Sequence, residues 1–173
     1  MELEGKKIAI LVADDYEDLE LWYPYYRMKE ADAEVDIIGC VMSSDKLKGR
    51  RGYMVDVQFK TDKADPSQYD AIIIPGGWAA DRLSWCPSTL DFIKKAFEQN
   101  KIISAISQGV WVLSSAGILA NKNVTSAISI RENVKIGGAN WADTDVVKDG
   151  NLITSRSTAD LPSFCREIIR SLT

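Results

Sequence analysis

Four stretches of the chain are almost wholly apolar, and each is short enough to form one buried β-strand. They cover residues 6–13, 33–40, 71–75 and 101–106. Strands buried on both faces of a parallel sheet read as continuous apolar runs, because neither face meets water. The four runs therefore predict the centre of a mostly parallel sheet.

Segments with helical spacing separate these runs. In the first of them Leu19, Trp22, Tyr23 and Tyr26 recur on one side of a helix. The predicted helices cover residues 17–31, 88–100, 108–120 and 158–172. Alternating strands and helices predict an α/β fold, with helices on both faces of the sheet.

Shorter β segments complete the pattern. Residues 47–57 form a small β excursion with glycines at its turns, and strand pieces are predicted at residues 124–130 and 134–136. A hairpin joins residues 144–147 to residues 152–155. No linker, repeat or low-complexity segment interrupts the chain, so residues 1–173 are expected to form one domain.

Composition and charge exclude several classes of protein. The chain is 46% hydrophobic and carries a net charge of −4, without the basic stripe of a nucleic-acid-binding protein. No apolar stretch approaches the ~20 residues that span a membrane, and the N-terminus lacks a signal-peptide pattern. We therefore predict a cytoplasmic protein with no nucleic-acid or membrane partner.

The cysteines and histidines limit the chemistry. Three cysteines share no metal-ligand spacing. Cys40 and Cys165 are expected in the core, whereas Cys86 is expected to be an exposed thiol in a loop. No phosphate-binding glycine loop is present, so no metal or cofactor is predicted. The chain has no histidine, which excludes every mechanism that needs a histidine base or ligand.

The strand that ends at Ile106 runs directly into a helix through Ser107, flanked two residues away by Ala105 and Gly109. This arrangement is typical of a nucleophile elbow, where small neighbours let the strand and helix approach closely. The alternative is that Ser107 only caps the helix, because serine is a preferred N-cap residue.

Two other strand ends lie at the same edge of the predicted sheet, where ligands of such folds bind. Pro75-Gly76-Gly77 could present the Gly77 N–H as one oxyanion donor beside the N–H of Gln108. Otherwise it is an ordinary turn. Glu17 could place a carboxyl group beside Ser107. Alternatively, the acids near it only stabilise the start of a helix.

Taken in order, these motifs resemble those of the PfpI/ThiJ intracellular-protease family. The matching segments are residues 16–21 (YEDLEL), 75–77 (PGG), 107–109 (SQG) and 155–161 (SRSTADL). The resemblance covers essentially the whole chain. It implies a flavodoxin-like three-layer α/β/α sandwich.

The resemblance also implies a site and an assembly. Family members include proteases, chaperones, glyoxalases and deglycases. Their elbow carries a Cys-His pair, with a glutamate at the position expected here for Glu17 and an acid from a neighbouring subunit at the position of Asp81. Homodimers and hexamers are typical, and the substrates are peptides or small carbonyl compounds.

This chain departs from the family at the centre of the site. Ser107 and Gln108 replace the Cys-His pair, Ala127 replaces a tyrosine of the pocket, and Thr158 replaces a proline. A serine hydroxyl needs a base that a thiolate does not, and Gln108 cannot exchange protons.

Three hypotheses follow from this departure. In the first, a degenerate elbow is non-catalytic or weakly active, and the protein binds a small molecule or acts as an oligomer. In the second, it is an active hydrolase, glyoxalase or deglycase, with Ser107 acting in place of cysteine or standing where the natural protein has cysteine. In the third, it is a structural or chaperone-like protein that acts through an oligomer interface. Trp78, Trp111 and Trp141 are candidates for lining the pocket.

Overall fold

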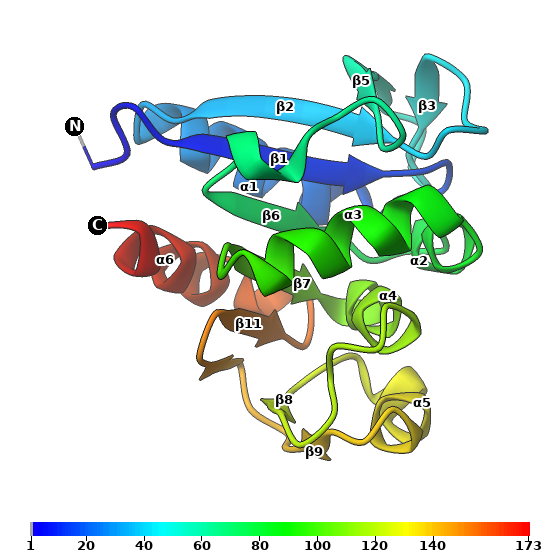
Figure 1. Ribbon diagram of the computed structural model, residues 1–173, viewed down its shortest axis with the longest axis vertical. Coiled ribbons are helices and arrows are strands. Elements are labelled where there is room, and N and C mark those ends of the chain that lie inside the picture. Colours follow the sequence, from blue (N-terminus) through cyan, green and yellow to red (C-terminus); the bar gives the residue numbers. More distant parts are fainter. Residues whose placement is uncertain (1) are drawn as a thin grey trace.

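The computed structural model describes residues 2–173. Its centre is a seven-stranded sheet with the strand order β10-β11-β7-β6-β1-β2-β5 (Figure 1). The strands are β1 (Lys7–Val12), β2 (Glu34–Gly39), β5 (Phe59–Lys60), β6 (Ala71–Ile74), β7 (Ile102–Ile106), β10 (Val146–Asp149) and β11 (Leu152–Ser155). All neighbouring pairs are parallel except β10 with β11. The predicted mostly parallel sheet is confirmed.

Helices cover both faces of this sheet. On one side α1 (Asp18–Glu30) packs beside α6 (Leu161–Leu172), and on the other α3 (Pro87–Glu98) contacts α2 (Ala79–Ser84) and α4 (Val110–Ser115). The predicted three-layer α/β/α sandwich is confirmed. None of the helices in residues 2–173 is long and apolar enough to cross a membrane.

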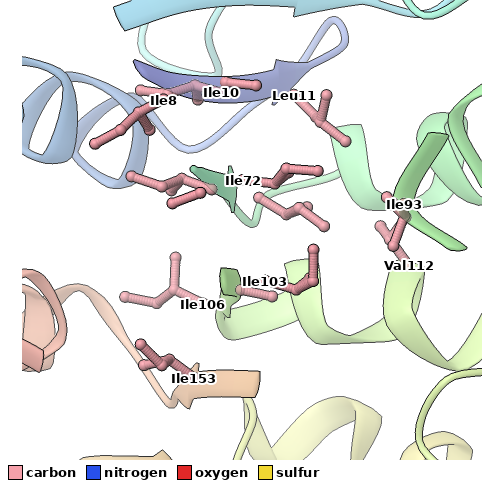
Figure 2. Close-up of a cluster of buried hydrophobic side chains, with 14 of the residues drawn as sticks. Ile8, Ile10, Leu11, Ile72, Ile93, Ile103, Ile106, Val112 and Ile153 are labelled. Atoms are coloured by element: carbon pink, nitrogen blue, oxygen red, sulfur yellow. The ribbon is translucent and has the colours of Figure 1, made fainter. Parts of the chain in front are cut away.

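Covering both faces explains the unbroken apolar runs. Along β1, Ile8 and Ile10 point toward the side of α1, whereas Leu11 points toward the opposite layer (Figure 2). Ile93 of α3 and Val112 of α4 extend into the core from that layer. All five side chains are fully buried. Successive side chains of a strand face opposite ways, so both sets must be apolar here.

The small β segments agree in part with the prediction. β3 (Lys46–Lys48) and β4 (Met54–Asp56) form the excursion expected at residues 47–57. The C-terminal hairpin is also present, and its loop is only two residues long because Asp149 pairs with Leu152.

The strand predicted at residues 134–136 is wrong, because these residues lie in α5 (Arg131–Ile136). Ile130 and Val134 are buried, whereas Ile128 and Ile136 are 70% and 86% exposed. Buried residues four apart follow a helical period. Of residues 124–130 only Val124 is in a strand, in the pair β8 (Asn123–Val124) and β9 (Asn140–Trp141).

The helix predicted for residues 108–120 is shorter than expected. A 3-10 turn at Ser107–Gly109 precedes α4, which ends at Ser115 ahead of the left-handed Gly117. In contrast, α2 was not predicted at all. Its six residues are too few to show a helical period in the sequence.

The prediction of an exposed Cys86 thiol is wrong. Cys86 is fully buried and forms a disulfide with Cys40, with a Cα–Cα distance of 6.3 Å. Cys40 follows β2 and Cys86 precedes α3, so the bond joins the end of a sheet strand to the start of a covering helix. Trp85 is the exposed residue of this loop. Cys165 is the free cysteine and is buried, as predicted.

The disulfide predicts a specific thiol count. The denatured protein should titrate one thiol before reduction and three afterwards. The bond closes a loop with a sequence separation of 46, which restricts the unfolded chain and stabilises the fold by about 4 kcal/mol. Cys86→Ser should lower the free energy of unfolding by a similar amount in urea denaturation. Cys40→Ser should do the same, and the double variant should lose no more than either single variant. Three thiols in the unreduced protein would contradict the bond.

Candidate functional site

Three strand ends meet at one edge of the sheet. Because β6 lies between β1 and β7, the turn after β6 sits between Glu17 and Ser107. The Glu17 N–H donates to the Gly76 carbonyl at 3.1 Å, and Tyr16 forms an isolated β-bridge with Gly77. The three segments therefore lie together at this edge, although β1 and β7 are not direct neighbours.

Ser107 occupies a strained turn. Its φ is 58°, in the left-handed region that residues with a side chain rarely adopt. A side chain at Gly109 is impossible without movement, because a Cβ there would lie 2.5 Å from the Ile74 carbonyl oxygen. The helix and strand therefore approach as an elbow requires. Ser107 makes no capping hydrogen bond, so the alternative of a plain N-cap is wrong.

The hydroxyl of Ser107 is paired with its neighbour. Ser107 Oγ donates to Gln108 Oε1 at 2.7 Å, and the Gly77 N–H donates to the same oxygen at 3.3 Å. Ser107 is 7% exposed. The predicted residues Ser107, Gln108 and Gly77 thus lie together, and the Gln108 carbonyl accepts both donors.

The backbone of Glu17 lies close to the elbow, whereas its side chain caps the start of α1. Its carboxylate accepts the N–H groups of Leu19 and Glu20 at 2.9 and 3.2 Å, as the N-cap of α1. It also lies 3.7 Å from the Arg51 guanidinium. These contacts match the alternative in which the Glu17 carboxylate only stabilises the start of a helix.

Glu20 is the carboxyl group that sequence reasoning missed. Its Oε2 accepts the Gly76 N–H at 2.8 Å, and its Oε1 accepts the Thr158 hydroxyl at 3.2 Å. A carbon added at Gly76 would lie 2.5 Å from Glu20 Oε2 and 2.9 Å from Ser107 Cβ. Glu20 therefore faces the elbow across a single glycine.

The sequence held one signal for this placement. Glu20, Pro24 and Met28 are spaced four apart and form the buried stripe of α1, whereas Leu19 and Tyr26 are exposed. The apolar spacing predicted for this helix runs through Leu19, Trp22, Tyr23 and Tyr26 instead, so it does not indicate that Glu20 is buried.

Burial changes the protonation of Glu20. Glu20 is 2% exposed, and the loss of hydration raises its pKa to about 7. The nearby Glu17 charge raises this pKa further. Hydrogen bonds from Gly76 and Thr158 and the charge of Arg50 lower it. At neutral pH Glu20 is therefore a mixture of the acid and the carboxylate.

Asp81 lies in a different hollow of the surface. It belongs to the first turn of α2, is exposed, and accepts the Trp85 indole N–H at 3.2 Å. The hollow also contains Asp14, Cys40 and Arg82. Within one chain the structure does not bring Asp81 to Ser107. Its predicted action across a subunit interface stays a prediction.

A cavity of about 390 Å³ opens beside Ser107. Its walls are Ser107, Ser126, Ala127, Ile128, Trp141, Asp143, Arg156 and Ser157. Of the three tryptophans considered above, Trp141 lines this cavity, and its indole N–H donates to Ser126 Oγ at 3.0 Å.

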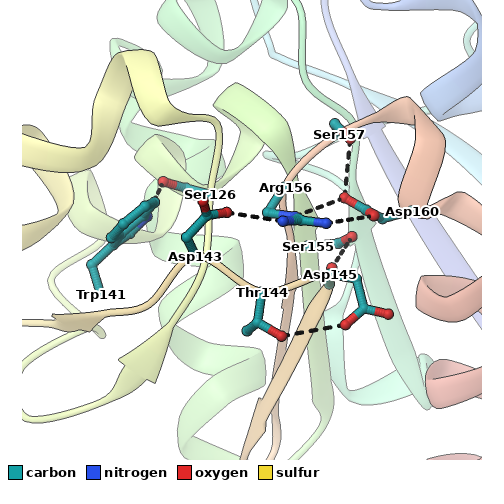
Figure 3. A network of polar contacts seen from close by, with 9 residues as sticks. All are labelled: Ser126, Trp141, Asp143, Thr144, Asp145, Ser155, Arg156, Ser157 and Asp160. Carbon is teal, nitrogen blue, oxygen red and sulfur yellow. Dashed lines mark hydrogen bonds and ion pairs between the residues drawn. The ribbon is translucent and has the colours of Figure 1, made fainter.

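A charged network holds one wall of this cavity (Figure 3). The Arg156 guanidinium donates to both carboxylate oxygens of Asp160 at 3.1 and 3.2 Å and to Asp143 at 2.9 Å. Both carboxylates raise the pKa of Arg156 above its usual range. Asp143 follows β9 and Asp160 precedes α6, so Arg156 links the small β8–β9 sheet to the rest of the fold.

The model of the DJ-1/PfpI family matches residues 6–171. The chain belongs to the DJ-1/PfpI family. It is 40% identical over 166 residues to a deglycase of Thermococcus kodakarensis, covering 96% of this chain and 99% of that protein. It is 37% identical, with the same coverage, to the deglycase PfpI of Pyrococcus furiosus.

Solved structures of DJ-1/PfpI proteins share the fold. A two-domain protein from Anabaena variabilis with DJ-1/ThiJ/PfpI-like and ferritin-like domains is 38% identical, with a TM-score of 0.94. The match covers 97% of this chain and 48% of that one. Schizosaccharomyces pombe DJ-1 is 27% identical with a TM-score of 0.88, over 96% of this chain and 92% of that chain. The expected flavodoxin-like sandwich is confirmed.

The raised pKa of Glu20 predicts a pH-dependent stability difference. Above pH ~7 the folded protein carries a buried charge, whereas below pH ~4.5 the carboxyl group is neutral in both states. Glu20→Gln keeps an acceptor for the Gly76 N–H without a charge. The free energy of unfolding of this variant, relative to the original protein, should therefore rise by up to about 3 kcal/mol between pH 4.5 and 8.

Urea denaturation across this pH range measures the effect. The matched control is Glu30→Gln, because Glu30 is an exposed carboxylate on the same helix and surface ion pairs contribute little. A flat difference for Glu20→Gln would mean that Glu20 is not a buried acid in solution.

Proposed function

We propose that this DJ-1/PfpI protein binds a small polar molecule in the cavity beside Ser107 and has lost the family's nucleophilic chemistry. The observation that carries this proposal is the hydrogen bond from Ser107 Oγ to the Gln108 side-chain carbonyl. An amide oxygen accepts this hydrogen bond without accepting the proton, so the hydroxyl stays a hydroxyl.

Among the described residues, the Ser107 hydroxyl donates to Gln108 and to no carboxylate. The carboxyl oxygens of Glu20 accept from Gly76 and Thr158, and Asp143, the carboxylate in the cavity wall, pairs with Arg156. No lysine is among the described residues that line the cavity. Because serine requires a base within hydrogen-bond reach to attack a carbonyl group, this set of neighbours supports binding without turnover.

The walls of the cavity support a neutral, hydroxyl-rich ligand. Three serine hydroxyls lie in it, at Ser107, Ser126 and Ser157. The positive charge of Arg156 is already neutralised by two carboxylates. A volume of about 390 Å³ is at the small end of the range for ligand sites.

The second candidate function is an active deglycase. It is favoured by the relatives of this chain, because two proteins named deglycases are 37% and 40% identical over nearly their full length. Under this proposal Ser107 acts as the nucleophile, or a cysteine does so where the natural protein has one.

A gain-of-function experiment separates the two candidates. Turnover of methylglyoxal should equal that of buffer for the original protein, and Ser107→Ala should not change it. The double variant Ser107→Cys with Gln108→His supplies a thiol and a base, and should raise the rate roughly 100-fold or more above background.

The matched control is Ser126→Cys, which adds a thiol to the same cavity away from the elbow and should leave the rate at background. A rate in the original protein that disappears in Ser107→Ala would instead establish the deglycase candidate.

We also propose that the protein assembles with copies of itself through α1. Leu19, Tyr23 and Tyr26 are 54%, 41% and 63% exposed, and Tyr53 and Met54 continue this apolar face. Two surface hollows of about 580 and 470 Å³ lie along it. Exposed apolar patches of this kind mark protein interfaces.

Placing a charge in this face should separate the copies. Sedimentation equilibrium should give at least a dimer for the original protein and a monomer for Tyr26→Asp, because the carboxylate would be desolvated at the interface. Asn133→Asp adds the same charge at an exposed position of α5 and should leave the assembly intact. A monomeric original protein would exclude self-association.

A further inference from the structure

We propose that Gln108 is an internal competitor of ligand binding: its side-chain carbonyl fills a position between two donors, Ser107 and Gly77, that a ligand's carbonyl oxygen would otherwise take. The ligand's oxygen would displace that of Gln108. This inference rests on the proposed function, ligand binding in the cavity beside Ser107.

Two donors from different strand ends converge on one oxygen. The Ser107 hydroxyl follows β7 and the Gly77 N–H follows β6, and they lie 2.7 and 3.3 Å from Gln108 Oε1. An amide carbonyl is a planar sp² oxygen acceptor, as is the carbonyl group of a ligand. The pair thus forms a two-donor site that the chain fills with its own side chain.

The backbone at each donor is held by contacts that do not involve the Gln108 side chain. Ser107, the first residue of the 3-10 turn after β7, is held at a φ of 58°. Gly77 has a φ of 81°, and a Cβ there would lie 2.5 Å from the Glu17 nitrogen and 2.6 Å from the Asp15 carbonyl oxygen. Only glycine fits, so the N–H direction is set by close backbone contact. Removing the Gln108 side chain should therefore keep both backbone positions and leave the Ser107 hydroxyl free to donate to a ligand.

Gln108 itself is held loosely enough to move. It is half-buried, and its side chain is anchored through three rotatable bonds. Its contact with Gly77 is longer than the usual 2.9–3.0 Å for an N–H donor. A ligand that aligns better with both donors can therefore replace it.

Ser107 connects this donor pair to the cavity. The same residue donates to Gln108 and lines the space bounded by Ser126, Trp141 and Arg156. Asp143 and Asp160 already hold the Arg156 guanidinium, and Glu20 lies behind Gly76. Anions therefore meet nearby carboxylates, whereas a neutral carbonyl compound finds the two donors and the serine hydroxyls.

Hydroxyacetone, a small neutral ketone, tests this inference. Its binding would be followed by NMR through the indole N–H of Trp141, which reports the cavity, and the amide of Gly77, which reports the donor pair. Gln108→Ala and Gln108→Met remove the competing oxygen, and the methionine variant keeps the length of the side chain. Gln108→Glu makes the competing oxygen a stronger, charged acceptor.

We expect Gln108→Ala and Gln108→Met to bind hydroxyacetone about fivefold tighter or more, because the oxygen that competes for both donors is gone. Gln108→Glu should bind more weakly than the original protein. Gln99→Ala, which removes an exposed glutamine far along α3, should bind with unchanged affinity. In Gln108→Ala the free Gly77 amide should also exchange its proton faster.

Two failures can be told apart. If the Trp141 signal shifts with equal affinity in the original protein, Gln108→Met and Gln108→Glu, ligand binding stands and the displacement of Gln108 is overturned. If no signal shifts in any variant, the cavity does not bind such molecules, and the proposed function and this inference both fail.

Discussion

The site depends on the close approach of three backbones at the end of β6. Gly76 lies between Glu20 and Ser107, Gly77 lies against Glu17, and Gly109 lies against the end of β6. A Cβ at any of these glycines would fall within 3.0 Å of a neighbouring atom. This constraint forces a turn with one donor toward Glu20 and another toward Gln108, and it fixes the elbow against the sheet.

The polar groups brought together by this approach largely satisfy one another. Glu20 accepts from Gly76 and Thr158, and Gln108 accepts from Ser107 and Gly77. Such pairing removes the cost of burying polar atoms, which is large when a partner is missing. It also pairs the Ser107 hydroxyl with an amide oxygen. Thr158 contributes to this balance with a hydroxyl that the proline expected at its position does not have.

The cavity beside the elbow is built from segments that are distant in the chain. Ala127 and Ile128 precede α5, Trp141 belongs to β9, and Arg156 follows β11. Arg156 holds these parts together through Asp143 and Asp160 (Figure 3). On the far side of the sheet's centre, the disulfide between Cys40 and Cys86 joins a strand end to α3 in the same way. Both connections join segments that are distant in the sequence.

The sequence by itself determined the layered fold, because unbroken apolar runs require burial on both faces and their order along the chain limits the sheet. It also placed Ser107 between a strand and a helix and excluded histidine chemistry, since both are local properties, but the backbone at Ser107 decided between an elbow and a plain helix cap. Only the tertiary structure decided which glutamate faces the elbow, because Glu17 and Glu20 differ by the rotation of one helix against the sheet. The disulfide and the shared acceptor at Gln108 were likewise decided there, since each joins groups from separate segments whose distance no local pattern specifies.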